Sequence, residues 1–192
     1  MASRRLLVHI VGEADLLLDL SPNSDSEHEN KKEWREKRAE RIEARRKVLK
    51  EALGDSDLVD RVRQLLAEGA WQDNFLSTPA PSPLFGVLNT IKSTAEPTPD
   101  LELLVIGTKQ NPLHPLDTLP IAQTLVDVLN AVAAADASFP IRKATVVPVA
   151  GQIEEPVVEA LTPHLDQAWR YQQGLVTWGS GATALSMGVL TA

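Results

Sequence analysis

The 192-residue sequence contains no cysteine and only four histidines, which lie far apart along the chain. The absence of cysteine excludes disulfides, thiolate zinc sites and cysteine nucleophiles, and it is compatible with a reducing cytosol. The scattered histidines leave no local histidine-based metal motif. The sequence therefore predicts neither a metal site nor a cofactor.

Long apolar runs are also missing, since none reaches the roughly 18 residues that a membrane-spanning helix needs. A short apolar stretch follows two arginines near the N-terminus. Glu13 and Asp15 stand where a signal peptide would need small residues at its cleavage site. We therefore expect a soluble cytoplasmic protein that does not bind membranes.

Positive charge is scarce outside one segment. The chain has 26 acidic and 19 basic residues, and residues 31–50 alone hold ten of the basic and four of the acidic ones. The remaining acidic body disfavours binding of duplex nucleic acid. The basic segment is predicted to form a helix over 31–53, and a solvated helix with paired charges is the favoured interpretation. Contact with a partner or a second copy comes next, and nucleic-acid binding third, because Trp34 is the only interleaved aromatic residue.

Short apolar runs that alternate with helical patterns predict an α/β fold with a Rossmann-like, mostly parallel sheet flanked by helices. The predicted strands are 4–12, 101–107, 143–149 and 174–178, and the predicted helices are 118–135, 155–171 and one that follows residue 183. Pro148 favours the end of a strand or an edge strand. Thr162-Pro163 predicts a break in the helix that it lies in.

Residues 13–100 are predicted to form a mainly helical insertion after the first strand, within one domain that spans residues 1–192. Besides the basic segment, residues 57–68 show helical spacing. A further helix is predicted to begin at Ser82-Pro83 and to contain Leu84, Leu88 and Ile91.

Ligands of open α/β sheets bind at the carboxyl ends of the strands. Four glycine-containing, mostly uncharged loops follow the predicted strands: Gly12-Glu13, Gly107-Thr108-Lys109-Gln110, Ala150-Gly151-Gln152 and Gly179-Ser180-Gly181-Ala182-Thr183. A single loop of this kind is more often an ordinary turn, but four at one edge favour a binding site. The candidate ligand-binding residues are Gly12, Glu13, Thr108, Lys109, Gln110, Gly151, Gln152, Gly179, Ser180, Gly181, Ala182 and Thr183.

The last of these loops leads into a helix N-terminus, where free amides favour an anion. It lacks the Gly-Lys-Ser/Thr of a Walker A loop and the spacing of the dinucleotide fingerprint. Ser180 lies outside a G-x-S-x-G elbow and has no identifiable His/Asp partner, which argues against a serine triad.

Three smaller features have local interpretations. Asp117-Thr118 before a helical run predicts an N-cap pair. For Lys109, phosphate contact and plain solvent exposure are equally favoured. Arg4 and His9 have the R-x4-H spacing of the HEPN ribonuclease motif, but they lie in a predicted strand whereas that motif requires a helix, so the match is a coincidence.

The stretch from Ser180 to Ser186 resembles the T-G-G-T-x-x-M loop of CRISPR-associated Rossmann-fold (CARF) sensor domains, which also lies between a late strand and a helix. Ala182 replaces the second glycine of that motif, and Met187 comes one position late.

An earlier stretch adds to this resemblance. Thr108-Lys109-Gln110, followed by Asp117-Thr118, is similar to the T-x-Q and D-T that some of these proteins carry between a strand and a helix. The resemblance covers mainly residues 101–192 and the first strand. Family members generally continue beyond the proposed loop and helix, so we expect a shortened or divergent member.

The resemblance implies a function. CARF domains are usually homodimers that bind cyclic oligoadenylate, a second messenger of type III CRISPR antiviral immunity, and thereby control an attached or associated effector. Some members also cleave the ring, and in such a ring nuclease Lys109 and Ser180 would be the first candidates to orient the phosphodiester. Another nucleotide-binding Rossmann-like protein, or a scaffold that works through its helical insertion, are further alternatives.

Overall fold

The computed structural model describes residues 4–12, 15, 39–40, 42–44, 46–47, 50–51, 53, 57, 60, 84, 87–88, 91, 100–110, 117–150, 154–165 and 173–178. Strands and helices alternate along the second half of the chain, as the sequence predicts. The elements in chain order are β1 (Arg4–Ile10), β2 (Asp100–Thr108), α4 (Leu119–Ala135), β3 (Ile141–Val149), α5 (Glu154–Leu165) and β4 (Gln173–Trp178).

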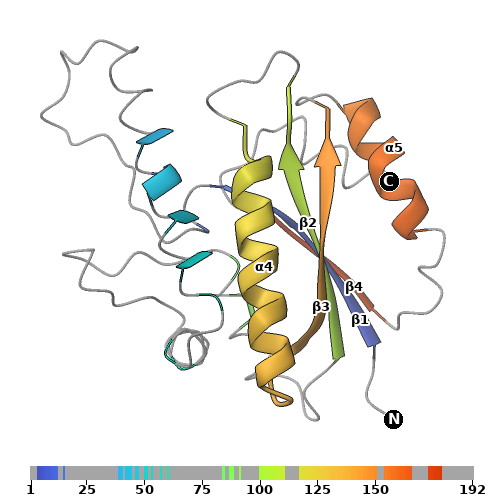
Figure 1. The fold of residues 1–192 in the computed structure, drawn as a ribbon. Coiled ribbons are helices and arrows are strands. Elements are labelled where there is room, and N and C mark those ends of the chain that lie inside the picture. The colour runs from blue at the N-terminus through green and yellow to red at the C-terminus, as the bar shows by residue number, and fades with distance from the viewer. Residues whose placement is uncertain are drawn as a thin grey trace, which may run out of the picture.

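The four strands form one sheet in the order β3-β2-β1-β4, and all three neighbouring pairs are parallel. The chain moves from β1 to β2 and β3 on one side, and then returns to place β4 on the other side of β1. The predicted class, an α/β fold with a parallel sheet flanked by helices, is confirmed (Figure 1).

Each face of the sheet has its own apolar core. Leu7 and Val11 belong to the cluster that contains the buried stripe of α4, whereas Val8 and Ile10 join Leu161 of α5. Because successive side chains of a strand point to opposite faces, α4 and α5 cover opposite faces of the sheet (Figure 1). Each such side chain contributes about 1.5–3 kcal/mol when fully buried.

The α4 side of the sheet also receives residues from the range predicted as an insertion. Leu84, Leu88 and Ile91 are helical, as predicted, and they are buried in the same cluster. Ile42 and Leu53 are half-buried against it. Most of residues 13–100 lie outside the described residues, so the mainly helical insertion remains a prediction.

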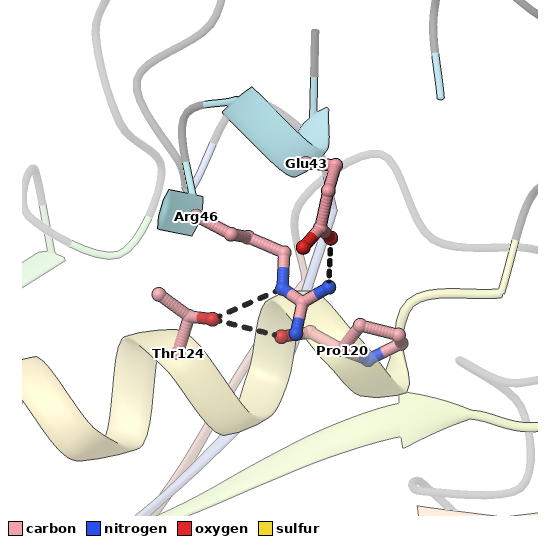
Figure 2. Close-up of polar contacts among 4 residues, drawn as sticks. All are labelled: Glu43, Arg46, Pro120 and Thr124. Atoms are coloured by element: carbon pink, nitrogen blue, oxygen red, sulfur yellow. Dashed lines mark hydrogen bonds and ion pairs between the residues drawn. The ribbon is translucent and has the colours of Figure 1, made fainter. Parts of the chain in front are cut away.

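The described part of the basic segment is anchored to α4 through Arg46 (Figure 2). Its Nε donates to Oγ1 of Thr124 at 3.1 Å, and that hydroxyl donates to the carbonyl of Pro120 at 3.1 Å. The Arg46 guanidinium also pairs with Glu43, and its side chain is 15 % exposed whereas that of Lys47 is 75 % exposed. This segment therefore has a face against α4 and a face in solvent.

Two proline predictions have different outcomes. Pro148 lies near the end of β3, which is an edge strand of the described sheet, as predicted. The predicted break at Thr162-Pro163 is wrong, because α5 continues to Leu165. Pro163 lies in the last turn, where it removes a single hydrogen bond to the carbonyl of the exposed Glu159, and that carbonyl can be solvated.

Gly107 allows β2 and α4 to approach each other closely. A Cβ atom at this position would lie 2.8 Å from Cβ of Ala122 and 2.8 Å from Cα of Leu119. The second of these atoms is backbone and cannot move aside without shifting the helix. Gly107 is thus needed for packing between strand and helix, at the base of the loop that follows β2.

Candidate functional site

Because β1, β2 and β3 are parallel, their carboxyl ends lie together at one end of the sheet, called the carboxyl edge (Figure 1). Beyond the strands, the N–H of Val11 donates to the carbonyl of Ile106 at 3.2 Å. The N–H of Lys109 donates to the carbonyl of Val149 at 2.9 Å. The residues that follow these strands therefore leave the sheet from fixed positions.

The strand order changes direction between β1 and β4, so the sheet has a topological switch point there. The connection after β1 leads to one side and β4 lies on the other, so the crevice between their carboxyl ends is the expected ligand position in such a sheet. Gly12, which follows β1, is buried there. The residues that follow β4 lie outside the described residues.

The loop that follows β2 is held by the residues just before α4. The N–H of Thr108 donates to Oγ1 of Thr118 at 3.0 Å, and the N–H of Thr118 donates to Oγ1 of Thr108 at 3.2 Å. The two hydroxyls lie 3.2 Å apart. The N–H of Gln110 donates to Oδ2 of Asp117 at 3.0 Å. The backbone on both sides of Lys109 is therefore fixed.

This arrangement corrects the N-cap prediction in part. Thr118 does occupy the N-cap position, and its carbonyl accepts the N–H of Ala122 at 2.9 Å, but its side chain makes no capping hydrogen bond. Its backbone is helical, with φ −99° and ψ −4°, whereas a capping residue normally has extended backbone. The hydroxyl turns instead to Thr108, because the partner on β2 competes for it.

Among residues 107–110, which the structure describes, Lys109 is exposed and Gln110 beside it is half-buried. Thr108 is 2 % exposed. A buried threonine and an anchored backbone amide thus flank a lysine that faces solvent at the carboxyl end of β2. This exposure is compatible with both predicted alternatives, phosphate contact and plain solvent exposure, which therefore remain predictions.

The end of β1 holds a buried carboxylate that the sequence analysis missed. Oδ2 of Asp15 accepts the N–H of Gly12 at 2.8 Å and lies 3.0 Å from Nε2 of His9, and both side chains are fully buried. Oδ1 of Asp15 accepts the N–H of Leu84 at 3.3 Å. The buried carboxyl group of Asp15 therefore has the hydrogen-bond partners that a polar group needs in the interior.

The signal for this group was a histidine inside an otherwise apolar strand, followed by an acid just past the closing glycine. Neither residue alone indicates a pair, since a lone histidine or a lone acid near a strand end is common. The third partner, Leu84, is 69 positions from Asp15 and cannot be read from local spacing.

Several predicted site residues lie outside the described part of the chain, and their roles remain predictions. They are Glu13, Gly151, Gln152, Gly179, Ser180, Gly181, Ala182 and Thr183. Of the predicted set, the structure places Gly12, Thr108, Lys109 and Gln110 at one edge of the sheet.

Within the described ranges, no group of three or more histidine, aspartate or glutamate side chains is arranged to hold a metal ion. No helix in this part of the chain is long and apolar enough to cross a membrane.

The described elements define an α/β protein with a parallel sheet whose winding reverses between β1 and β4. No family model, curated protein or solved structure matches the chain.

Proposed function

We propose that this chain is a Rossmann-like, cytoplasmic sensor domain of the CARF type that binds cyclic oligoadenylate and controls an attached or associated effector in an antiviral response. One observation carries the proposal. The residues of its T-x-Q and D-T stretches, Thr108, Gln110, Asp117 and Thr118, bond to one another across the loop after β2.

The bonded loop suits a phosphodiester ligand. Lys109 is exposed between two anchored residues, so its ammonium group projects from a backbone that does not have to be ordered on binding. Such preorganisation lowers the entropic cost of binding. The side-chain amide of Gln110 offers both a donor and an acceptor, which is the chemistry needed to contact an adenine edge.

The symmetry of the proposed ligand suggests that two copies of the chain bind it together. A cyclic oligoadenylate repeats the same phosphate and base around a ring, and a symmetric ring is matched by two copies of the same edge. We therefore expect a homodimer whose strand-end loops face a shared cleft. The loop from Gly179 to Thr183 is expected to supply amides for a phosphate from the far side of β1.

Binding is tested by incubating the purified chain with cyclic tri-, tetra- and hexa-adenylate, and with linear oligoadenylates of the same lengths. We expect retention of one ring size in preference to its linear form, and light scattering that shows a dimer. If no ring is retained and only monomer is present, the proposal fails.

A second experiment addresses the loop after β4. Gly181→Val adds a side chain where close backbone approach to the ligand is proposed, so it is expected to abolish nucleotide binding while thermal unfolding remains cooperative. A variant that is destabilised yet binds normally once folded would remove this loop from the site. Analysis of the retained nucleotide for linear products tests the ring-nuclease alternative in the same samples.

A further inference from the structure

The β3 strand has a neighbouring strand on one side only in the described sheet, so the backbone groups on its other side have no strand partner within that sheet. The carbonyl of Val149 faces β2, because it accepts the N–H of Lys109. The register between β2 and β3 is regular from Lys143 to Val149. Since alternate residues of a strand point their N–H and C=O groups to opposite sides, Ala144, Val146 and Pro148 present theirs outward.

Asn130 of α4 occupies the first of these three positions. Its Oδ1 accepts the N–H of Ala144 at 2.9 Å, and its Nδ2 donates to the carbonyl of Ala144 at 3.0 Å. These are the two bonds that a residue on a neighbouring strand would make. The side-chain amide of Asn130 thus takes the place of a strand partner.

The third outward position has no donor, since Pro148 lacks a backbone N–H. Of the outward donors between Lys143 and Val149, this leaves the N–H of Val146 for a new strand. Lys143 adds an exposed positive charge at the start of β3, whereas the neighbouring Arg142 is paired with Asp100 of β2. Natural edge strands use lysine and proline in this way to discourage pairing.

We infer that Asn130 closes the β3 edge to strand pairing with a second copy of this chain. The inference rests on the hydrogen bonds and strand order alone, and it does not depend on the proposed ligand. It also restricts the proposed homodimer, which would have to form through a surface other than a continuous sheet across β3.

The first test replaces the amide. Asn130→Ala keeps α4 helical because alanine is the best helix former, and it removes both bonds to Ala144. The matched control is Gln123→Ala, which removes an exposed amide from the same helix. By NMR hydrogen exchange on the folded protein, the Ala144 amide is expected to exchange about tenfold faster in Asn130→Ala than in the control.

The second test detects the pairing itself. Because the chain has no cysteine, Lys143→Cys introduces a single thiol at the exposed start of the edge. With a short bis-maleimide, cross-linked dimer is expected to increase at least several-fold when Asn130→Ala is added, and to stay at the parent level when Gln123→Ala is added. The increase is expected to grow with protein concentration.

A third variant separates edge closure from simple fold stabilisation. Val146→Pro removes the remaining outward N–H, so adding it to Asn130→Ala is expected to return cross-linking to the parent level. Should Asn130→Ala fail to fold, Asn130→Asp has nearly the same shape, loses the donor to the Ala144 carbonyl, and is expected to raise cross-linking by a smaller factor. If the folded Asn130 variants cross-link no more than the control, Asn130 only stabilises the fold and the inference is wrong.

Discussion

The ends of β1 and β2 lie at the same edge of the sheet, yet they use their polar residues in opposite ways. At the end of β1, both oxygens of Asp15 are engaged by backbone amides, and His9 lies against it in full burial. At the end of β2, the side chains of Asp117 and Thr118 accept hydrogen bonds from backbone N–H groups on either side of Lys109, and Lys109 itself is exposed.

The difference shows what distinguishes a structural polar group from a candidate binding group at one edge. Asp15 connects β1 to the helix that contains Leu84, so its interactions are complete within the fold. In the described part of the loop after β2, the side chains of Thr108, Asp117 and Thr118 bond to the backbone, and the side chain of Lys109 is exposed. A ligand site needs such an exposed group on a fixed backbone, because an ordered loop loses little entropy on binding.

The largest effect on folding is expected from Asp15→Ala. The change leaves the N–H groups of Gly12 and Leu84 without their acceptor in the interior, and removes the carboxylate beside His9. Each buried donor that is left without an acceptor costs about 1–3 kcal/mol. Chemical denaturation measures the free energy of unfolding, and Asp127→Ala, an exposed aspartate of α4, is the control. A loss below about 1 kcal/mol would contradict a structural role for Asp15.

Gly107→Ala is expected to have the next largest effect. The added methyl group would meet Cα of Leu119 at 2.8 Å, so α4 must shift away from β2. Overpacking of this kind costs about 1–3 kcal/mol. The thermal midpoint of Gly107→Ala is expected to fall. It is expected to fall less in the double variant with Ala122→Gly, which removes the Cβ atom of Ala122 from the close contact. An unchanged midpoint in Gly107→Ala would show that strand and helix are less closely packed.

Thr118→Val tests the support of the loop after β2. Valine keeps the shape of threonine but removes the hydroxyl, which leaves the Thr108 N–H without its acceptor. The expected cost is about 1–2 kcal/mol in the free energy of unfolding. Thr145→Val, at a half-buried threonine of β3, is the control. If the N-cap prediction had been right, the hydrogen exchange of the first turn of α4 would change instead of that of Thr108.

This pair of threonines also shows where sequence reasoning succeeded and where it stopped. Apolar runs predicted the four strands, because the strands of a parallel sheet are covered on both faces, and helical spacing of apolar residues predicted α4, which buries one stripe against the sheet. The strand order could not be predicted, since it depends on pairing between segments as far apart in the sequence as Arg5 and Gln173. Asp117-Thr118 was interpreted as a local cap for the same reason: the competing partners on β2 are brought near only by the fold.

Lys109→Ala is expected to change stability least and to separate the two strand ends most clearly. Lys109 is exposed, so truncating its side chain removes little packing within the fold. The free energy of unfolding should therefore stay within about 0.5 kcal/mol of the parent. If Lys109 contacts a phosphate of the proposed ligand, its loss weakens binding roughly tenfold to a hundredfold. Lys143→Ala removes an exposed lysine near the start of β3, away from the carboxyl edge, and should leave affinity unchanged. Equal affinities for the two variants would make Lys109 a surface residue and leave the ordered loop after β2 without a ligand-binding role.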